Sequence, residues 1–439
     1  MGGEYAGKSV LDARKQVVSD LEEKKLVEKI DTKYKNRIGV CYRCGRIIEP
    51  LPLPQFFVKV KDQKKNLVKN VLDALDSQET IILGAGREKI LRNWLENLND
   101  WNISRQIVWG IKIPVWYELK GNEAKITASF ISKDGKYTTG ILSELLEKSS
   151  LNEIKNGLQS IVADSTVPYI ISTEKLNDED NYIPETDTFD TWFSSSQWPV
   201  LTLKTNQPGD FERFYPTTVM ETAYDILLFW VMRMMLMGSY VTGKSPFSIV
   251  YLHGLVRDQQ GKKMSKSKGN VVNPLEIIDQ YGADALRMAL VIRSTPGLDK
   301  SVGHPDFKAA RNLSNKIWNA ARFVIMLEEN ENKSSKKASE LDKKLAKIVK
   351  NVTQNLEKYQ IGVAADTLYN EFWHWYCDIC IEDAKNGEIS KEKMIKILTV
   401  FLKMMHPFMP FVTEAVWQEL HNEKLVSDTQ LITAEWPTT

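Results

Sequence analysis

A short apolar run followed by a lysine-rich loop constrains the fold more than any other feature of this sequence. Residues 248–254 form an apolar run that closes on His253-Gly254, which predicts a buried strand delivering its carboxyl end to a site. Residues 261–270 follow closely and contain four lysines and two serines. Such donors suit phosphates, and nucleotides bind beyond the carboxyl ends of strands in open α/β sheets. The pattern predicts an α/β fold with a nucleoside triphosphate site, although charge alone would equally suit a solvated face or a nucleic-acid patch.

Size and charge set the limits for the rest of the chain. With 439 residues, 43% of them hydrophobic, the chain is long enough for two or three domains with sizeable cores. Lys and Arg number 58 against 57 Asp and Glu, so local basic patches would have to meet any RNA partner. The apolar stretch 226–237 is broken by Arg233 and is predicted to be too short to span a bilayer. The first twenty residues carry charges throughout, so we expect no signal peptide and no membrane partner.

The four cysteines form two close pairs far apart in the chain. Cys41 and Cys44 have the spacing of half a zinc knuckle, but Cys377 and Cys380 lie about 330 residues further on in an apolar, helical stretch. A tetrahedral zinc site needs four ligands, so a simple turn at Cys41 is favoured and zinc is not expected. Reduced thiols of this kind suit a cytoplasmic protein.

Hydrophobic periodicity predicts the elements in outline. A charged amphipathic helix is expected at 10–29, a strand at 55–60, a helix at 66–75, a small α/β unit at 118–185, and a buried helix at 221–237. Further helices are expected to begin near Asn273 and Tyr281. Apolar residues at three- and four-residue steps then predict a helical bundle, with helices at 306–326, 341–356, 364–384 and 391–405.

Several segments resemble the class I aminoacyl-tRNA synthetases, and among them the valine enzymes. Residues 263–267, Lys-Met-Ser-Lys-Ser, look like the second signature of the class. Residues 93–117 are similar to the stretch where valine, isoleucine and leucine enzymes re-enter the catalytic domain after an editing insertion. On spacing alone, its first half would suit a core tryptophan pair with a surface arginine. Residues 190–195, Asp-Thr-Trp-Phe-Ser-Ser, have the form associated with valine enzymes, and 311–319 are also close to them.

The resemblance implies an α/β fold made of a partial class I Rossmann-type nucleotide-binding domain followed by an all-α anticodon-binding helical bundle. The expected domains are a remnant of the editing insertion at 1–49, re-entry into the catalytic domain at 50–117, a small α/β insertion at 118–185, the second Rossmann half with its stem at 186–305, and the anticodon-binding bundle at 306–439.

The function that the resemblance implies is ATP-dependent ligation of L-valine to tRNA(Val) through a valyl-adenylate. Positive charge would stabilise the departing pyrophosphate, with Mg²⁺ sharing the charge. The implied site residues are Lys263 and Lys266 for catalysis; Asp225, His253, Gly254, Met264, Ser265 and Lys266 for ATP; Trp109 and Trp192 for the amino acid; and none for a metal.

The first signature of the class, His-Ile-Gly-His, has no counterpart among the five histidines. We therefore expect the carboxy-terminal portion of a valine enzyme, either from a truncated reading frame or as one piece of a split enzyme, inactive without its amino-terminal half. Two alternatives stay open. One is a non-catalytic tRNA-binding module; the other is an isoleucine enzyme, which residues 190–195 disfavour.

Overall fold

The structure is a computed structural model that describes residues 3–5, 8–35, 37–41, 44–48, 52–174, 176, 178–264, 269–328 and 335–438. The chain divides into two compact units, Met1–Pro54 and Gln55–Thr439, which are described separately. In the first unit, α1 (Val10–Glu23) begins at Ser9, whose side chain accepts a hydrogen bond from the Asp12 amide. The predicted helix at 10–29 is too long, because Lys25 adopts a left-handed backbone conformation that ends the helix. Further on, the Cys41 amide donates to the Arg46 carbonyl oxygen, and Val40 and Ile47 form an antiparallel bridge.

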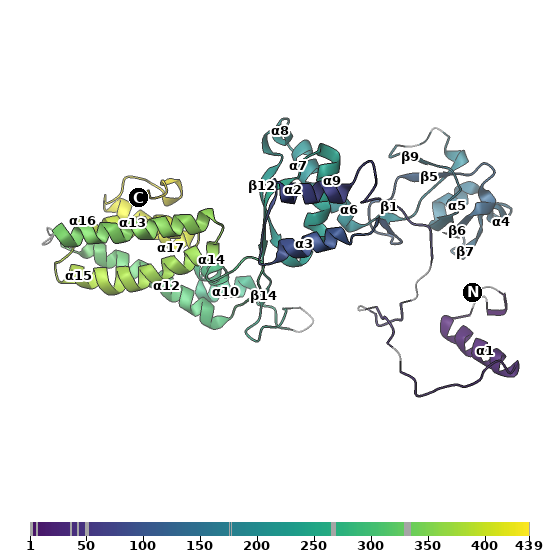
Figure 1. The fold of residues 1–439 in the computed structure, drawn as a ribbon, viewed down its shortest axis with the longest axis horizontal. Helices are drawn as coiled ribbons and strands as arrows, with labels where there is room; N and C mark the ends of the chain where they lie inside the picture. Colours follow the sequence, from purple (N-terminus) through teal and green to yellow (C-terminus); the bar gives the residue numbers. More distant parts are fainter. Residues whose placement is uncertain are drawn as a thin grey trace. The chain divides into compact units, whose positions relative to one another are not determined.

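A three-stranded parallel sheet forms the centre of the second unit. Its strands are β2 (Ile81–Leu83), β12 (Thr217–Ala223) and β13 (Phe247–His253), in the order β12-β13-β2. Helices α2 (Leu67–Asp76), α3 (Arg87–Glu96) and α9 (Met232–Thr242) share its core. Figure 1 shows these helices grouped around β12. The predicted strand at 248–254 and helix at 66–75 are confirmed within one residue at each end.

The buried helix predicted at 221–237 is wrong at its start. Residues up to Ala223 belong to β12, and the helical stretch runs from Tyr224 to Thr242, through a 3-10 turn (Tyr224–Ile226) and a π-helical turn (Leu227–Val231) into α9. By length and composition Tyr224–Thr242 could cross a membrane, so the prediction that this region is too short is also wrong. Core helices of globular proteins pass the same test, and Met234 and Met235 pack here in the same core as Val250.

Two short antiparallel ribbons connect the sheet to a smaller α/β region. β1 (Phe57–Val58) pairs with β3 (Trp101–Asn102), and β4 (Ser104–Arg105) pairs with β11 (Thr188–Phe189). The expected strand at 55–60 is thus only two residues long. The smaller region has its own core around Ile126, Phe130 and Ile154. Its elements are the sheet β5 (Val115–Glu118), β9 (Tyr169–Ile171) and β10 (Tyr182–Pro184); the sheet β6 (Ile126–Ile131), β7 (Tyr137–Ile141) and β8 (Leu158–Ala163); and helices α4 (Leu142–Leu146) and α5 (Leu151–Gly157).

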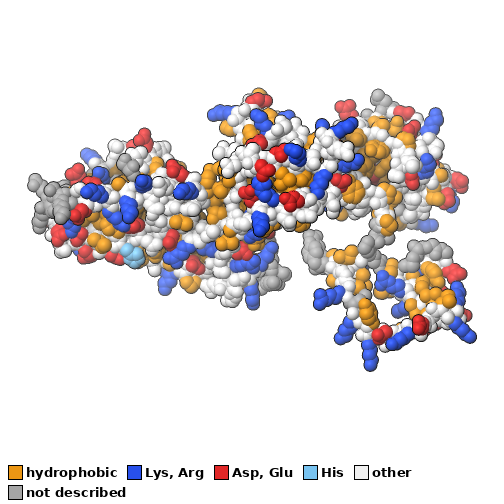
Figure 2. Space-filling model, in the orientation of Figure 1, with side chains coloured by type: hydrophobic (Ala, Val, Ile, Leu, Met, Phe, Trp, Pro, Cys, Tyr) orange, Lys and Arg blue, Asp and Glu red, His pale blue; other side chains and the backbone are white. Residues whose placement is uncertain are grey.

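Between β11 and β14 (Val256–Arg257) lie three short helices besides α9. These are α6 (Thr191–Ser195), α7 (Trp198–Thr205) and α8 (Asp210–Phe214). β14 pairs in parallel with β15 (Lys300–Ser301). Figure 2 shows basic and acidic side chains intermixed over the visible face, in keeping with the net charge of +1.

The remaining helices form one bundle around a continuous apolar core. Figure 1 shows its long members side by side in green to yellow. The predicted helix at 391–405 is confirmed as α16. The helices predicted at 306–326 and 341–356 are longer in the structure than predicted. α17 was not predicted; Pro410 occupies its first helical turn, where proline is tolerated. The bundle contains α10 (Pro274–Tyr281), α11 (Ala283–Val291), α12 (His304–Met326), α13 (Ser335–Glu357), α14 (Ile361–Asn370), the π-helical Glu371–Cys380, α15 (Ile381–Lys385), α16 (Lys391–Met405) and α17 (Pro410–Asn422).

Candidate functional site

The carboxyl ends of the parallel strands bring two predicted site residues to one edge of the sheet. His253 is the last residue of β13 and pairs in register with Ala223, the last residue of β12. Asp225 follows Ala223 after one residue, in the first turn of the helical stretch, where backbone amides have no helical partner. Both Asp225 and His253 are exposed. A ligand beyond the sheet can therefore reach a carboxylate and an imidazole on neighbouring strands.

Local contacts fix the backbone at this edge. The His253 Nδ1 lies 2.8 Å from the Gly254 carbonyl oxygen, and its Nε2 lies 3.4 Å from Oε1 of Glu221. Gly254 is required by packing, because a Cβ there would lie 1.7 Å from the Leu298 carbonyl oxygen. Gly254 therefore has a structural role at this turn, separate from its predicted role in binding ATP. Arg87, which sequence reasoning missed, stacks its guanidinium 3.6 Å from the centre of the Tyr224 ring at the same edge.

Hydrogen bonds hold the base of the lysine-rich loop. The backbone of Lys263 pairs with that of Arg257 in β14 through an isolated antiparallel β-bridge, just beyond the end of β13. Asp258 accepts from the Lys262 amide and from Nδ2 of Asn270, both at 2.8 Å, and so ties the two sides of the loop together. The hydrogen bond from Asn270 lowers the pKa of Asp258, so this acceptor stays ionised.

The loop's own predicted residues are placed as follows. The Lys263 side chain is exposed and Met264 is half-buried. Ser265 and Lys266, both predicted to bind ATP, lie outside the described residues. Within the described part of the chain, no three His, Cys, Asp or Glu side chains converge on a position for a metal ion.

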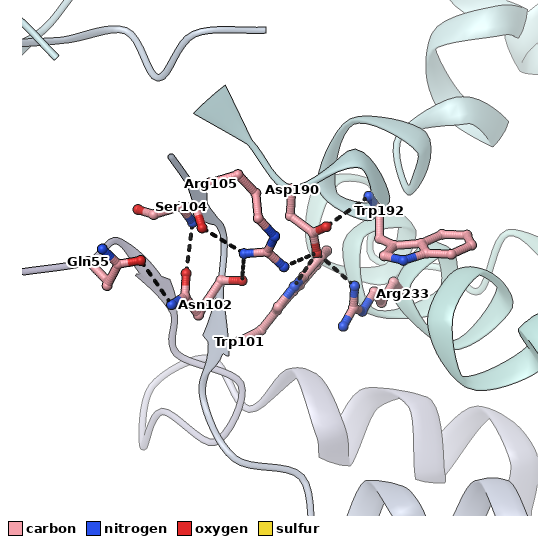
Figure 3. Close-up of polar contacts among 8 residues, drawn as sticks. All are labelled: Gln55, Trp101, Asn102, Ser104, Arg105, Asp190, Trp192 and Arg233. Carbon is pink, nitrogen blue, oxygen red and sulfur yellow. Dashed lines mark hydrogen bonds and ion pairs between the residues drawn. The ribbon is translucent and has the colours of Figure 1, made fainter. Parts of the chain in front are cut away.

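A buried carboxylate that sequence reasoning missed connects three segments, as Figure 3 shows. Asp190 Oδ2 accepts from Nε1 of Trp101 at 3.0 Å and from Arg233 at 2.8 Å, and it lies 3.2 Å from a guanidinium nitrogen of Arg105. Asp190 Oδ1 accepts from the Trp192 amide at 3.4 Å, at the start of α6. The Arg233 guanidinium also stacks 4.2 Å from the centre of the Trp101 ring. Burial lowers the pKa of Arg233, against the opposing effect of Asp190.

A cleft of about 500 Å³ opens beside this cluster. Trp94, Asn99 and Leu236 line it together with Trp101, Arg105 and Arg233. The Trp94–Arg105 segment therefore does not fit the alternative of a buried tryptophan pair with a solvent-exposed arginine. Trp101 is buried, Trp94 is 44% exposed, and the arginine is engaged with a buried acid.

The two tryptophans predicted for the amino-acid end have different surroundings. Trp192 is half-buried and stacks on Phe229, with ring centroids 6.0 Å apart. Phe229 follows Asp225 in the same helical stretch, so Trp192 packs on the stretch that carries the predicted ribose ligand. Trp109 is 91% exposed in a loop with the equally exposed Val108. The structure does not test its predicted role, which stays a prediction.

Comparison with known proteins identifies the family. The family described as tRNA synthetases class I (I, L, M and V) matches residues 8–302, which is more than half of the chain. The chain belongs to the class I tRNA synthetases. The family described as the anticodon-binding domain of tRNA ligase matches residues 338–439. The predicted fold, a class I Rossmann-type domain followed by a helical anticodon-binding domain, is thereby confirmed.

Relatives of this class I chain point to the valine branch. It is 37% identical over 448 residues to a Valine--tRNA ligase from Thermotoga maritima, covering 99% of the chain and 46% of the relative. A Valine--tRNA ligase from Clostridium acetobutylicum is 38% identical with the same coverage. The chain thus spans about half the length of the curated relatives it matches.

Solved structures agree on the fold. A Mycobacterium tuberculosis methionyl-tRNA synthetase in complex with methionyl-adenylate matches with a TM-score of 0.60 at 14% identity, over 87% of this chain and 66% of that one. A ternary complex of an Agrobacterium radiobacter LeuRS with tRNA and LeuAMS matches with a TM-score of 0.53 at 18% identity, over 81% of this chain and 46% of that one.

Proposed function

We propose that this class I chain takes part in the ATP-dependent ligation of L-valine to tRNA(Val) through a valyl-adenylate. The observation that carries the proposal is the shared strand edge, where Asp225 and His253 follow neighbouring parallel strands and the lysine-rich loop begins just beyond. Valine is favoured as the substrate because the curated relatives at 37–38% identity are Valine--tRNA ligases.

The chemistry requires positioning and charge more than covalent catalysis. The valine carboxylate attacks the α-phosphate of ATP and pyrophosphate leaves; a ribose hydroxyl at the end of the tRNA then attacks the carbonyl carbon of the valyl-adenylate, and AMP leaves. Lys263 and Lys266 are assigned to the negative charge that grows on pyrophosphate, and Ser265 to a phosphate hydrogen bond. Asp225 is assigned to the ribose, because its carboxylate accepts two hydroxyl hydrogen bonds. His253, Gly254 and Met264 are assigned to the adenine.

Mg²⁺ belongs to the same proposal as a companion of the nucleotide. It would share the charge of the ATP phosphates when bound. Magnesium often keeps several waters and binds through substrate phosphates with one or two carboxylates. The described residues fit that mode better than a protein-made cage, because they offer no cluster of three metal-binding side chains. No protein ligand for the metal is assigned, and zinc is not part of the proposal.

The amino-acid pocket needs further apolar walls from another polypeptide segment. Trp192 and Trp109 are assigned to the pocket, but Trp109 exposes 91% of its surface. A pocket that selects a small aliphatic side chain must enclose it in apolar walls. We assign the missing walls to an amino-terminal half of the enzyme, supplied as a separate polypeptide if the enzyme is split. The bundle is assigned to tRNA(Val), and the cytoplasm, where tRNA is charged, is the proposed place of action.

Valine-dependent exchange of pyrophosphate into ATP tests this proposal. The chain is assayed with and without an amino-terminal fragment of a Valine--tRNA ligase, and exchange is expected only with the fragment. Replacing Lys263 or Lys266 by Ala is expected to lower the exchange rate roughly a hundredfold or more, because each removes a charge aimed at the leaving group. Binding of tRNA(Val) is expected to change little.

Lys244→Ala serves as the matched control, since this exposed lysine precedes β13 at the opposite edge of the sheet. Exchange at the unmodified rate in Lys266→Ala would refute the role of that lysine. Tight tRNA binding without exchange under either condition would favour the non-catalytic tRNA-binding module, and exchange driven by isoleucine would favour the isoleucine alternative.

A further inference from the structure

Asp190 lies where three segments from distant parts of the sequence meet. Trp101 and Arg105 come from the β3 and β4 ribbons, Trp192 from α6, and Arg233 from α9. Asp190 is only 4% exposed, and Trp101 only 7%. Figure 3 shows the surrounding donors pointing at this one carboxylate.

The two carboxylate oxygens face different partners. Oδ2 accepts from the Trp101 indole and from Arg233 and lies within ion-pair distance of Arg105, while Oδ1 accepts from the Trp192 amide in the first turn of α6. One buried negative charge therefore compensates two guanidinium groups, of which Arg233 is the more buried. Hydrogen bonds between charged groups are stronger and more directional than neutral ones, so this arrangement fixes its partners firmly.

The segments joined in this way are the ones that carry the proposed ligands. α6 begins directly at Asp190 and carries Trp192. The helical stretch that contains Arg233 carries Asp225 in its first turn, and its exposed Phe229 stacks on Trp192. We propose that Asp190 is a positioning residue that sets Trp192, and with it the amino-acid end of the site, against the helix that carries Asp225. This inference rests on the proposed function for its consequence in catalysis.

Asp190→Asn is the variant that isolates this role. Asparagine has the same shape but only one accepting oxygen, so it cannot serve both the arginines and the α6 amide. Arg233, whose side chain is 16% exposed, would also lose its counter-charge. In the exchange assay with the amino-terminal fragment, the KM for valine is expected to rise roughly ten- to a hundredfold. The KM for ATP is expected to change less than twofold, since Lys263 and His253 are untouched.

Two further variants separate positioning from stability. Asp187→Asn is the matched control, because Asp187 is also buried but accepts from Gln106 at 2.7 Å. It should leave the KM for valine unchanged. The double variant Asp190→Asn/Arg233→Met removes the unpaired cation, so it should recover melting temperature without recovering the KM for valine. If the double variant restores both, or if folded Asp190→Asn keeps the KM of the unmodified chain, the proposal is overturned.

A second measurement uses the chain by itself. With 5-fluorotryptophan incorporated, the fluorine signals of Trp101 and Trp192 can be assigned by single Trp→Phe changes. Both signals should shift in Asp190→Asn and neither in Asp187→Asn, whereas an unmoved Trp192 signal would contradict the proposal. A complete lack of exchange by the unmodified chain with the fragment would instead count against the proposed function, and the fluorine spectra would still decide the placement of Trp192.

Discussion

The chemistry of single cysteines in this protein is set by burial. Burial raises the pKa of Cys377 and of Cys380 to about 12, whereas Cys44 is exposed. At pH 8 a thiol with that pKa is ionised in only about one molecule in ten thousand, and thiolate is the reactive form. We expect Ellman's reagent to modify Cys44 rapidly in the native chain and to reach Cys377 and Cys380 only after unfolding.

The Cys44→Ser variant is the control for this reaction, since it should remove the rapid phase contributed by that thiol. Raising the pH from 7 to 9 increases the thiolate fraction of the two buried thiols about a hundredfold, but only to about one molecule in a thousand, so their modification should stay far slower than that of Cys44 at both pH values. Native-state modification of Cys377 or Cys380 at a rate comparable to that of Cys44 would show that the helix opens locally.

Single residues of the site were predictable from sequence only where a motif or a strand end marked them. His253 was marked by the end of the predicted strand at 248–254 and Asp225 by the resemblance to class I synthetases, and the structure places both at the carboxyl ends of neighbouring strands. Asp190 was missed, since its partner Arg233 lies 43 residues further along the chain. A signal was nevertheless present: an arginine inside an apolar helix requires a buried acceptor, and a helix-capping aspartate is a natural candidate.

At the level of elements, α11 determines where α17 begins. Asp284 of α11 accepts from the amides of Phe411 and Val412, at 3.2 and 2.6 Å, in the first turn of α17. Arg287 of the same helix donates to the carbonyl oxygens of Pro407 and Phe408. Asp284→Ala should therefore lower the unfolding free energy of the bundle by about 1–3 kcal/mol, because buried amides lose their acceptor. Urea denaturation followed by the helical circular dichroism signal measures this change.

The same link predicts a dependence on pH. Burial raises the pKa of Asp284, which the two backbone hydrogen bonds oppose. The folded chain thus holds this proton at pH values where the unfolded chain has released it. The contribution of Asp284 to stability is then largest below about pH 4 and falls as the pH rises through the folded pKa. The difference in unfolding free energy between the unmodified chain and Asp284→Asn should decrease over that range.

Elements were predictable where one periodicity ran without interruption. α16 has the predicted bounds, since apolar residues recur at helical steps from one end to the other. β12 was missed because its three threonines and one glutamate leave no apolar run to mark a strand, and because it passes directly into the following helical stretch. The backbone pairing with β13, which no local pattern encodes, decides that Thr217–Ala223 is a strand.

At the scale of the whole molecule, the apolar loop at residues 107–111 is exposed. Ile107, Val108, Trp109 and Ile111 are between 54% and 96% exposed. β12 lies at an edge of the sheet as far as the structure describes it, and its Val219 is 43% exposed. Contiguous exposed apolar surface of this kind typically marks an interaction site. Both features lie in the class I catalytic part of the chain, where the proposed amino-terminal half has to complete the pocket.

Trp109 is expected to anchor that association. Because the side chain is 91% exposed, Trp109→Ser should change the melting temperature of the isolated chain very little. In a titration with the amino-terminal fragment, however, Kd should rise roughly tenfold or more, since a buried tryptophan at an interface commonly contributes about 2 kcal/mol or more. Phe411→Ser is the control, because Phe411 is 65% exposed on α17 in the anticodon-binding bundle. Equal Kd values for the two variants would mean that the fragment does not cover the loop, and the amino-acid pocket would have to be completed elsewhere.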